Sequence, residues 1–251
     1  MLVDAHCHLQ DPRLAADLEG VLARARAAGV GAFVVCGTRE ADWGAVLDLA
    51  RTRAGVIPFA GLHPWHVAEA SPGWEPALVA AFHAGAGAGE AGLDFSEGRP
   101  DRDLQEAVLA AQVRLAAAHG LPLALHAVKA ADRLAAVLRR VGLGRAGGYV
   151  HAFSGAPEVA RTYLDLGLHL SFGGAITRPG ATRAQAALAF VPRDRYLLET
   201  DAPDLAPAGV TGPNEPAHLA LIAAAAGRIR GEDAGARAAD NARTLLGRWL
   251  A

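Results

Sequence analysis

Two histidines near the start of the chain stand two residues apart, in the segment DAHCHL. His6 and His8 follow a short apolar run, and alternate residues of an extended segment point to the same side. Imidazole nitrogens are common ligands of zinc and of other divalent transition metals. The pair therefore predicts one part of a metal site. Cys7, between the two histidines, is expected to point the other way and to pack in the core.

Four further side chains of ligand type end apolar runs later in the chain. They are Glu90 in GEAGLDF, His126 in LPLALHA, His151 in YVHAFSG and Asp201 in LLETDAP. A buried carboxylate is costly without a cation beside it. Four imidazoles and two carboxylates suit Zn, Mn or Fe and, less naturally, Mg. Because six ligands exceed what one hydrolytic ion with an open position needs, we expect two divalent metal ions that share a bridging carboxylate.

Eight short aliphatic runs alternate with longer amphipathic stretches and could position these side chains. The runs predict strands at residues 2–5, 31–36, 56–61, 86–90, 121–126, 148–151, 168–172 and 196–199. Strands that alternate with helices form parallel sheets, and eight such units favour a closed barrel. We therefore expect the α/β class, as a (β/α)8 TIM barrel forming one domain over residues 1–251. All six candidate ligands would then lie at strand C-termini, the face where such barrels place their sites.

The clearest helical pattern lies in the middle of the chain. Its expected apolar face consists of Leu104, Val108, Ala111, Leu115 and Ala118. Asp103 is a plausible N-cap, and Gly120 a plausible stop signal.

Composition limits the classes of partner. The 251 residues carry a formal net charge of −2 and are 52% hydrophobic, with two cysteines and no block of like charge. Two cysteines are too few for a disulfide framework. No apolar run has the length of a membrane span, and the N-terminus lacks the features of a signal peptide. We expect a cytoplasmic protein with no obligate protein partner, in which any contact with nucleic acid is local to the site.

The ordered set of motifs resembles the TatD family of metal-dependent deoxyribonucleases, within the amidohydrolase superfamily. The resemblance runs through DAHCHL, GLHPW, GEAGLDF, LHA, HAFSG and ETDAP to the segment NEP at Asn214 to Pro216. It implies hydrolysis of phosphodiester bonds, as in a 3′–5′ exonuclease that acts on nucleic-acid ends or on a small phosphodiester. It also implies that His6, His8 and Asp201 hold one ion and that His126 and His151 hold the other. Glu90 would bridge the two ions.

Catalytic roles are expected for both carboxylates. Glu90 would act as the bridge, and Asp201 could also accept the proton of the attacking water. By the resemblance, His63 in GLHPW lies near the site, where it would touch substrate phosphate or a further ion. Lys129 and Arg178 follow the fifth and seventh expected strands and are candidates for the phosphate, as is Arg39 after the second.

The sequence departs from the family pattern at two places. Val128 stands where the family often has Arg, and the segment from Asp201 to Pro216 has no Lys or Arg but contains Asp204 and Glu215. These departures predict a thin phosphate-binding shell. They keep two alternatives open, a hydrolase of an amide, ester or lactone and a non-catalytic metal-binding protein.

Two further residues have two interpretations each. Asp94 could support a ligand histidine or cap a helix or turn. Trp65 could stack on a base or pack within its own loop.

Overall fold

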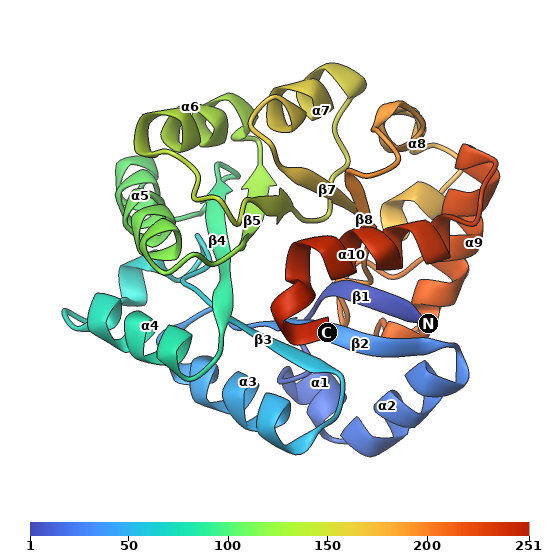
Figure 1. Cartoon of the computed structure of the whole chain (residues 1–251), viewed down its shortest axis with the longest axis horizontal. Helices are drawn as coiled ribbons and strands as arrows, with labels where there is room; N and C mark the ends of the chain where they lie inside the picture. Colours follow the sequence, from blue (N-terminus) through green and yellow to red (C-terminus); the bar gives the residue numbers. More distant parts are fainter. Residues whose placement is uncertain (251) are drawn as a thin grey trace.

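Eight parallel strands form one sheet in the order of the chain, from β1 to β8. The computed structural model describes residues 1–250, and Figure 1 looks along the barrel that the strands make. The strands are β1 Leu2–Cys7, β2 Val30–Cys36, β3 Val56–Ala60, β4 Gly87–Asp94, β5 Leu123–Val128, β6 Gly148–Val150, β7 His169–Phe172 and β8 Tyr196–Leu198. The expected (β/α)8 TIM barrel is confirmed.

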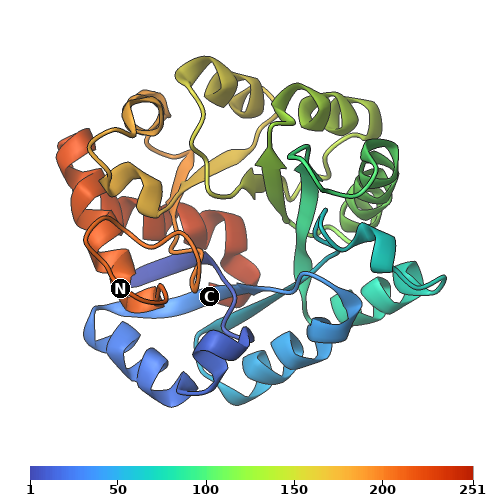
Figure 2. The same cartoon turned by 180° about the vertical axis from the view of Figure 1, so that it is seen from behind.

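Helices surround the barrel, as Figure 2 shows from behind. They are α1 Pro12–Ala15, α2 Leu18–Ala27, α3 Glu40–Thr52, α4 Trp74–His83, α5 Arg102–Ala118, α6 Ala131–Val141, α7 Pro157–Leu164, α8 Thr182–Phe190, α9 Leu219–Arg230 and α10 Ala234–Leu250. Three short 3-10 turns lie at η1 Val67–Glu69, η2 Gly174–Thr177 and η3 Pro216–His218. No helix within residues 1–250 is long and apolar enough to cross a membrane.

The segment after β8 completes the ring against β1. The Asp201 N–H donates to the His6 carbonyl oxygen at 2.9 Å, and the His8 N–H donates to the Ala202 carbonyl oxygen at 2.7 Å. The two ends of the sheet therefore meet where three candidate ligands stand.

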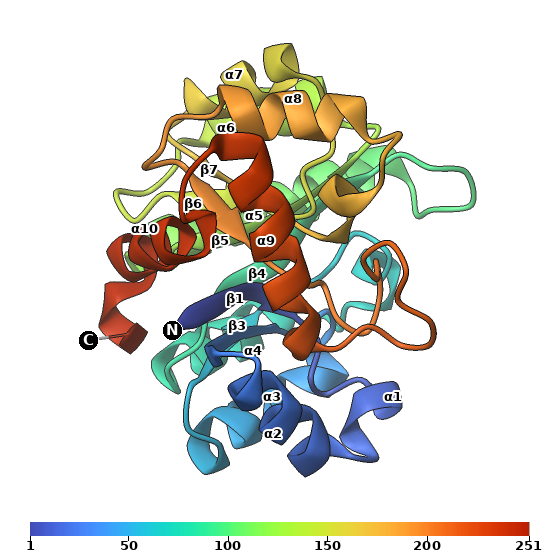
Figure 3. The same ribbon diagram turned by 90° about the vertical axis from the view of Figure 1, so that its right-hand side faces the viewer.

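Two apolar cores hold the fold together. One lies between the barrel and the surrounding helices. The other fills the barrel interior and includes Val34, Phe59 and Tyr149 together with Leu246 from α10. Figure 3 shows α10 at one end of the barrel and the long loops after β4 and β8 at the other. The last helix thus closes the end of the barrel that lies away from the candidate ligands.

The predicted ends of the ligand-bearing strands were wrong in part. Glu90 lies within β4 rather than at its end, and His6 and His126 lie within β1 and β5. The segment GAGEAGLD has low strand propensity, but its glycines permit close packing. A side chain at Gly92 would collide with the His126 backbone of β5. His8 and Asp201 follow their strands, as predicted, and His151 comes directly after β6.

The helix predicted near residues 104–118 begins earlier and faces differently. The N-cap of α5 is Asp101 and not Asp103, because the Asp101 carboxylate accepts the Leu104 N–H at 3.0 Å. Leu104 is 39% exposed, so it does not belong to the buried face. Buried positions include Gln105 and Gln112, polar side chains that hydrophobic periodicity does not count.

Candidate metal centre

The six predicted ligand side chains converge at the carboxyl end of the barrel. Five of them line a cavity of about 660 Å³, and His6 lies fully buried beside it. Glu90 lies at the centre of the group, where both of its oxygens face imidazole nitrogens.

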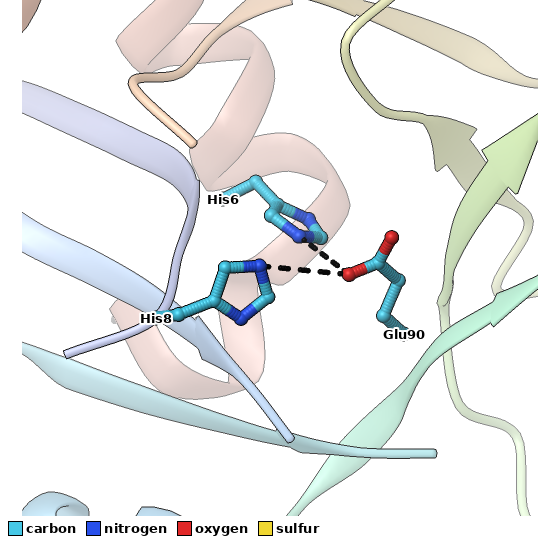
Figure 4. A group of neighbouring side chains, drawn as sticks. All are labelled: His6, His8 and Glu90. Carbon is cyan, nitrogen blue, oxygen red and sulfur yellow. Dashed lines mark hydrogen bonds and ion pairs between the residues drawn. The ribbon is translucent and has the colours of Figure 1, made fainter. Parts of the chain in front are cut away.

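A first set of donor atoms surrounds one oxygen of Glu90. Its Oε2 lies 3.1 Å from His6 Nε2 and 3.6 Å from His8 Nε2, as Figure 4 shows. Asp201 Oδ1 lies 3.9 Å from His6 Nε2 and 3.4 Å from His8 Nε2. Ligands about 2.1 Å from a tetrahedral zinc ion stand roughly 3.4 Å apart. The four atoms therefore fit the coordination shell of one divalent ion.

A second set surrounds the other oxygen of Glu90. Its Oε1 lies 2.9 Å from His126 Nδ1 and 2.8 Å from His151 Nε2, and those two nitrogens are 3.0 Å apart. Ligands of an octahedral ion with bonds of about 2.1 Å are spaced at roughly 3.0 Å. This set therefore also fits a divalent ion. Glu90 offers one oxygen to each set.

The protonation of two histidines follows from their backbone contacts. His8 Nδ1 lies 2.9 Å from the Cys36 carbonyl oxygen, which can only accept, so Nδ1 carries a proton. Burial by itself would lower the pKa of His8, but its contacts with Asp201 and Glu90 raise that pKa to about 9, so Nε2 is protonated as well when no cation is beside it. His63 is the reverse case, because its Nδ1 accepts the Trp65 N–H at 3.2 Å. The proton of the neutral His63 ring is therefore on Nε2, which lies 3.3 Å from Glu90 Oε1. In this form His63 donates a hydrogen bond, and with Glu90 and His126 it also belongs to a group of side chains that could hold a metal ion.

Two buried carboxylates lie behind the candidate ligand histidines. Glu199 Oε1 lies 3.5 Å from His151 Nδ1 and accepts the Ala152 N–H at 2.5 Å. Asp94 Oδ2 lies 3.7 Å from His126 Nε2, beyond hydrogen-bond distance, so its supporting role stays a prediction. Such carboxylates orient ligand rings and raise their basicity. The sequence analysis missed Glu199, although it stands two residues before Asp201 in the same motif.

The electrostatics of the centre keep both candidate carboxylate ligands charged. Burial by itself would raise the pKa of Glu90, but His151, His63 and His6 hold that pKa well below its usual range. Burial likewise opposes ionisation of Asp201, and its contact with His8 lowers the pKa overall. Burial lowers the pKa of His63 to about 4, so this ring is neutral near pH 7. Anionic carboxylates are the forms that bind metal ions, and a bound cation would favour loss of the proton from the ligand imidazoles.

The cysteines lie on opposite sides of the barrel wall. Cys7 packs in the outer core, as expected, with its thiol 3.5 Å from the Val34 carbonyl oxygen. Cys36 is buried in the inner core, where its sulfur lies 3.5 Å from His6 Nδ1.

The candidates for substrate contact do not all reach the same space. His63 and Arg39 line the cavity of the candidate ligands. Lys129 lines a neighbouring cavity of about 650 Å³, whose wall also includes His151. Arg178 lies at the surface, where its guanidinium donates to the Ala206 carbonyl oxygen at 3.2 Å.

The acidic residues after Asp201 are neutralised by arginines from the start of the chain. Arg13 makes hydrogen bonds of 2.8 and 2.9 Å to the two carboxylate oxygens of Asp204. Arg24 pairs with Glu215 at 2.7 and 2.8 Å. The excess of negative charge that the sequence suggested at this loop is therefore largely compensated in the fold.

The NEP segment holds that loop in place through Asn214. Its buried amide donates to the Thr200 carbonyl oxygen at 2.7 Å and to the Asp204 carbonyl oxygen at 2.8 Å. The loop is thereby tied to the strand end that carries Asp201.

Comparisons with known proteins identify the family of the chain. The family described as TatD related DNase matches residues 3–247. The chain is 35% identical over 243 residues to the metal-dependent hydrolase YjjV of Escherichia coli strain K12, with 92% of this chain and 91% of that protein covered. It is 34% identical over 262 residues to the 3′-5′ ssDNA/RNA exonuclease TatD of Klebsiella pneumoniae strain 342, with 98% of both chains covered.

A solved structure agrees as well. The crystal structure of the Escherichia coli K12 TatD homologue YjjV superposes with a TM-score of 0.93 at 34% identity, covering 97% of both chains. Motifs, fold and centre all lead to the same assignment, and the chain belongs to the TatD family of metal-dependent hydrolases.

Proposed function

We propose that the protein is a 3′–5′ exonuclease that removes nucleotides from the ends of single-stranded nucleic acid. The observation that carries the proposal is the division of Glu90 between two sets of donor atoms, since sites with two metal ions serve phosphoryl chemistry. The name of the Klebsiella relative, at 34% identity, supports the substrate class.

The proposed ligands of two divalent ions, Zn, Mn or Mg, are His6, His8, Glu90, His126, His151 and Asp201. Two ions bound there would lower the pKa of a water between them and neutralise charge on the phosphate. The protein supplies the rest. Asp201, held ionised beside His8, is placed to accept the proton of the attacking water.

Binding of the phosphate is proposed for residues around the same space. The Nε2–H of His63 lies beside Glu90 Oε1 and would donate to a non-bridging phosphate oxygen that enters the cavity next to that carboxylate. Lys129, in the neighbouring cavity, would meet a phosphate further along the strand. The role of Arg178 stays a prediction for longer strands.

The first experiment follows digestion of single-stranded DNA labelled at either end. Metal-stripped protein is resupplied with Mg, Mn or Zn, and Glu90→Gln, His126→Ala and the surface control Glu158→Gln are assayed alongside. We expect stepwise shortening from the 3′ end, about a hundredfold or more slower in Glu90→Gln and His126→Ala. Glu158 is exposed on α7, so its variant should match the wild type.

Metal content is measured on the same samples. Unchanged turnover in Glu90→Gln with its ions intact would contradict the bridging role. If the wild type binds two ions but cuts no DNA, the nuclease proposal fails. A panel of bis-p-nitrophenyl phosphate against amides, esters and lactones then decides the bond type, and turnover restored by metal on any substrate excludes a purely binding role.

A further inference from the structure

Two large apolar side chains are exposed at the cavity of the candidate centre. Residues 1–250 expose six such side chains, and among these Trp65 and Leu205 line that cavity. Trp65 is 44% exposed, although it stands on the loop that carries the buried His63. Exposure of an indole to water is unfavourable, and a ligand that covered the ring would remove that cost.

The Trp65 ring is held in a fixed orientation. Its indole N–H donates to Asp94 Oδ2 at 2.6 Å, and its backbone N–H donates to His63 Nδ1. The ring also meets His63 edge to face, with the planes at 90° and the centroids 4.9 Å apart. A preorganised aromatic side chain loses little entropy when a ligand binds to it.

One face of the indole is already occupied. The Arg99 guanidinium carbon lies 3.8 Å from the ring centroid, and Arg99 Nε lies 3.4 Å from Asp94 Oδ2. With Arg99 against one face and the N–H edge bonded to Asp94, the exposed part of the ring is its remaining surface at the cavity that Trp65 lines. An aromatic surface backed by a cation therefore remains available at the cavity.

The surface lies one side chain away from the candidate ligands. Asp94 joins Trp65 to His126, because the same Oδ2 lies 2.6 Å from the indole nitrogen and 3.7 Å from His126 Nε2. A group stacked on Trp65 would belong to the nucleotide whose phosphate is at the centre.

We infer that the free face of Trp65 is the stacking site for the base of the terminal nucleotide. The inference rests on the proposed exonuclease function and names the recognition element for its substrate. Every base has a π-face, so stacking accepts all four bases but rejects a nucleotide without a base. Trp65 is a substrate-binding residue here, and Arg99 positions it from behind.

The test compares oligonucleotides that carry a base or an abasic residue at the 3′ end. We expect Trp65→Leu, which keeps apolar bulk without a π-face, to lower kcat/KM about tenfold on the base-bearing end. The abasic end should be poor with the wild type and change little in the variant. Trp65→Phe should retain most of the preference, and Trp74→Leu, on α4 outside the cavity, should behave as the wild type.

If Trp65→Leu lowers kcat/KM equally on the base-bearing and the abasic 3′ end, Trp65 has a merely structural role and the inference is overturned. A second measurement keeps it distinct from the proposed function. In chelator, without turnover, thymidine dinucleotide should quench tryptophan fluorescence in the wild type but not in Trp65→Leu. If the wild type cuts no DNA, the exonuclease proposal fails, and equal quenching in both proteins would overturn the stacking site.

Discussion

Arg13 sets the charge at the entrance of the cavity. Its guanidinium pairs with Asp11 at 2.8 Å and with Asp204 at 2.8 Å, and all three residues line the cavity. The contacts hold the pKa of Asp11 below its usual value, so the carboxylate stays charged and compensated. The loop after β8 can therefore carry an acidic residue without repelling a phosphate.

Replacement of Arg13 by Ala should leave two uncompensated carboxylates at the entrance. We expect KM for single-stranded DNA to rise several-fold at low salt, and the difference to shrink at high salt as charges are screened. Arg13→Ala/Asp204→Asn should recover part of the loss. Arg51→Ala, which breaks a surface pair on α3, is the matched control. A rise in KM that is the same at low and high salt would contradict the electrostatic role of Arg13.

His169 lies away from the candidate centre and makes the free energy of unfolding depend on pH. It begins β7, it is buried, and its Nδ1 has no hydrogen-bond partner within residues 1–250. Burial lowers its pKa, and Arg195 lowers it further. The folded ring therefore resists the proton that the unfolded chain accepts below about pH 6.5. Its contribution to stability is complete above that pH and is lost as the pH falls below it.

The contribution of His169 to the free energy of unfolding should fall by about 1.4 kcal/mol for each pH unit below 6.5, while the folded ring stays neutral. Urea unfolding of metal-free protein on either side of that pH should show a smaller loss in His169→Leu than in the wild type. Metal-ligand histidines titrate in both proteins, so their contribution cancels in the difference. Identical pH dependence in the two proteins would rule out His169 as a source.

At the scale of elements, α5 fixes the loops that carry the support of the centre. Gln112 accepts the Leu62 N–H at 2.8 Å and donates to the Leu62 carbonyl oxygen at 3.0 Å. Gln105 makes the same pair of contacts with the backbone of Asp94. Two buried amides thus clamp the segments leading to His63 and to the Asp94 carboxylate.

Gln112→Met should leave both buried backbone groups of Leu62 without partners. We expect the free energy of unfolding to fall by about 2–6 kcal/mol, because each of the two groups costs about 1–3 kcal/mol. Hydrolysis should also slow, since Leu62 precedes His63. Urea denaturation and turnover of the folded fraction measure the two effects. Unaltered stability would show that water replaces the amide.

The barrel and the six candidate ligands were predictable because short segments of the sequence carry the signals for both. Apolar runs alternate with amphipathic stretches, and His6 and His8 share the period of a strand. Contacts between distant segments carry no such signal. Arg13 meets Asp204, and Trp65 meets Asp94 and Arg99, only because the barrel brings their loops together.

Strand ends were less predictable than strand existence. Gly92 lies beyond the strand end predicted at residue 90, although it belongs to β4 because the strand packs tightly on β5. The buried face of α5 differs from the predicted one for a similar reason. Gln105 is polar, but it is buried because its side chain makes hydrogen bonds with the backbone of Asp94. Low propensity and buried polarity are both resolved only by tertiary contacts.

At the scale of the whole molecule, α10 seals the end of the barrel opposite the candidate centre. Leu246 is fully buried against the inner core, and the Trp249 indole N–H donates to the Gly85 carbonyl oxygen at 2.9 Å. Trp249 also packs on Phe59, with ring centroids 5.6 Å apart. We propose that residues 1–251 act as one domain, with α10 part of its cooperative unit.

Leu246→Ala should lower the free energy of unfolding by about 2–5 kcal/mol, as expected for a fully buried leucine. A single unfolding transition should remain, and turnover of the folded protein should not change, because the cavity lies at the other end. Fluorescence and circular dichroism in urea provide the measurement. Separate transitions by the two probes would contradict a single domain.

Closure of the ring by the segment after β8 has a consequence for how the centre is made. His6 and His8 belong to the first strand of the barrel and its end, whereas Asp201 follows the last strand, far along the chain. The first set of donor atoms is therefore assembled only when the backbone of the segment after β8 bonds to β1. A metal ion bound there would stabilise the closed ring itself, because it would bind the native form that created the site.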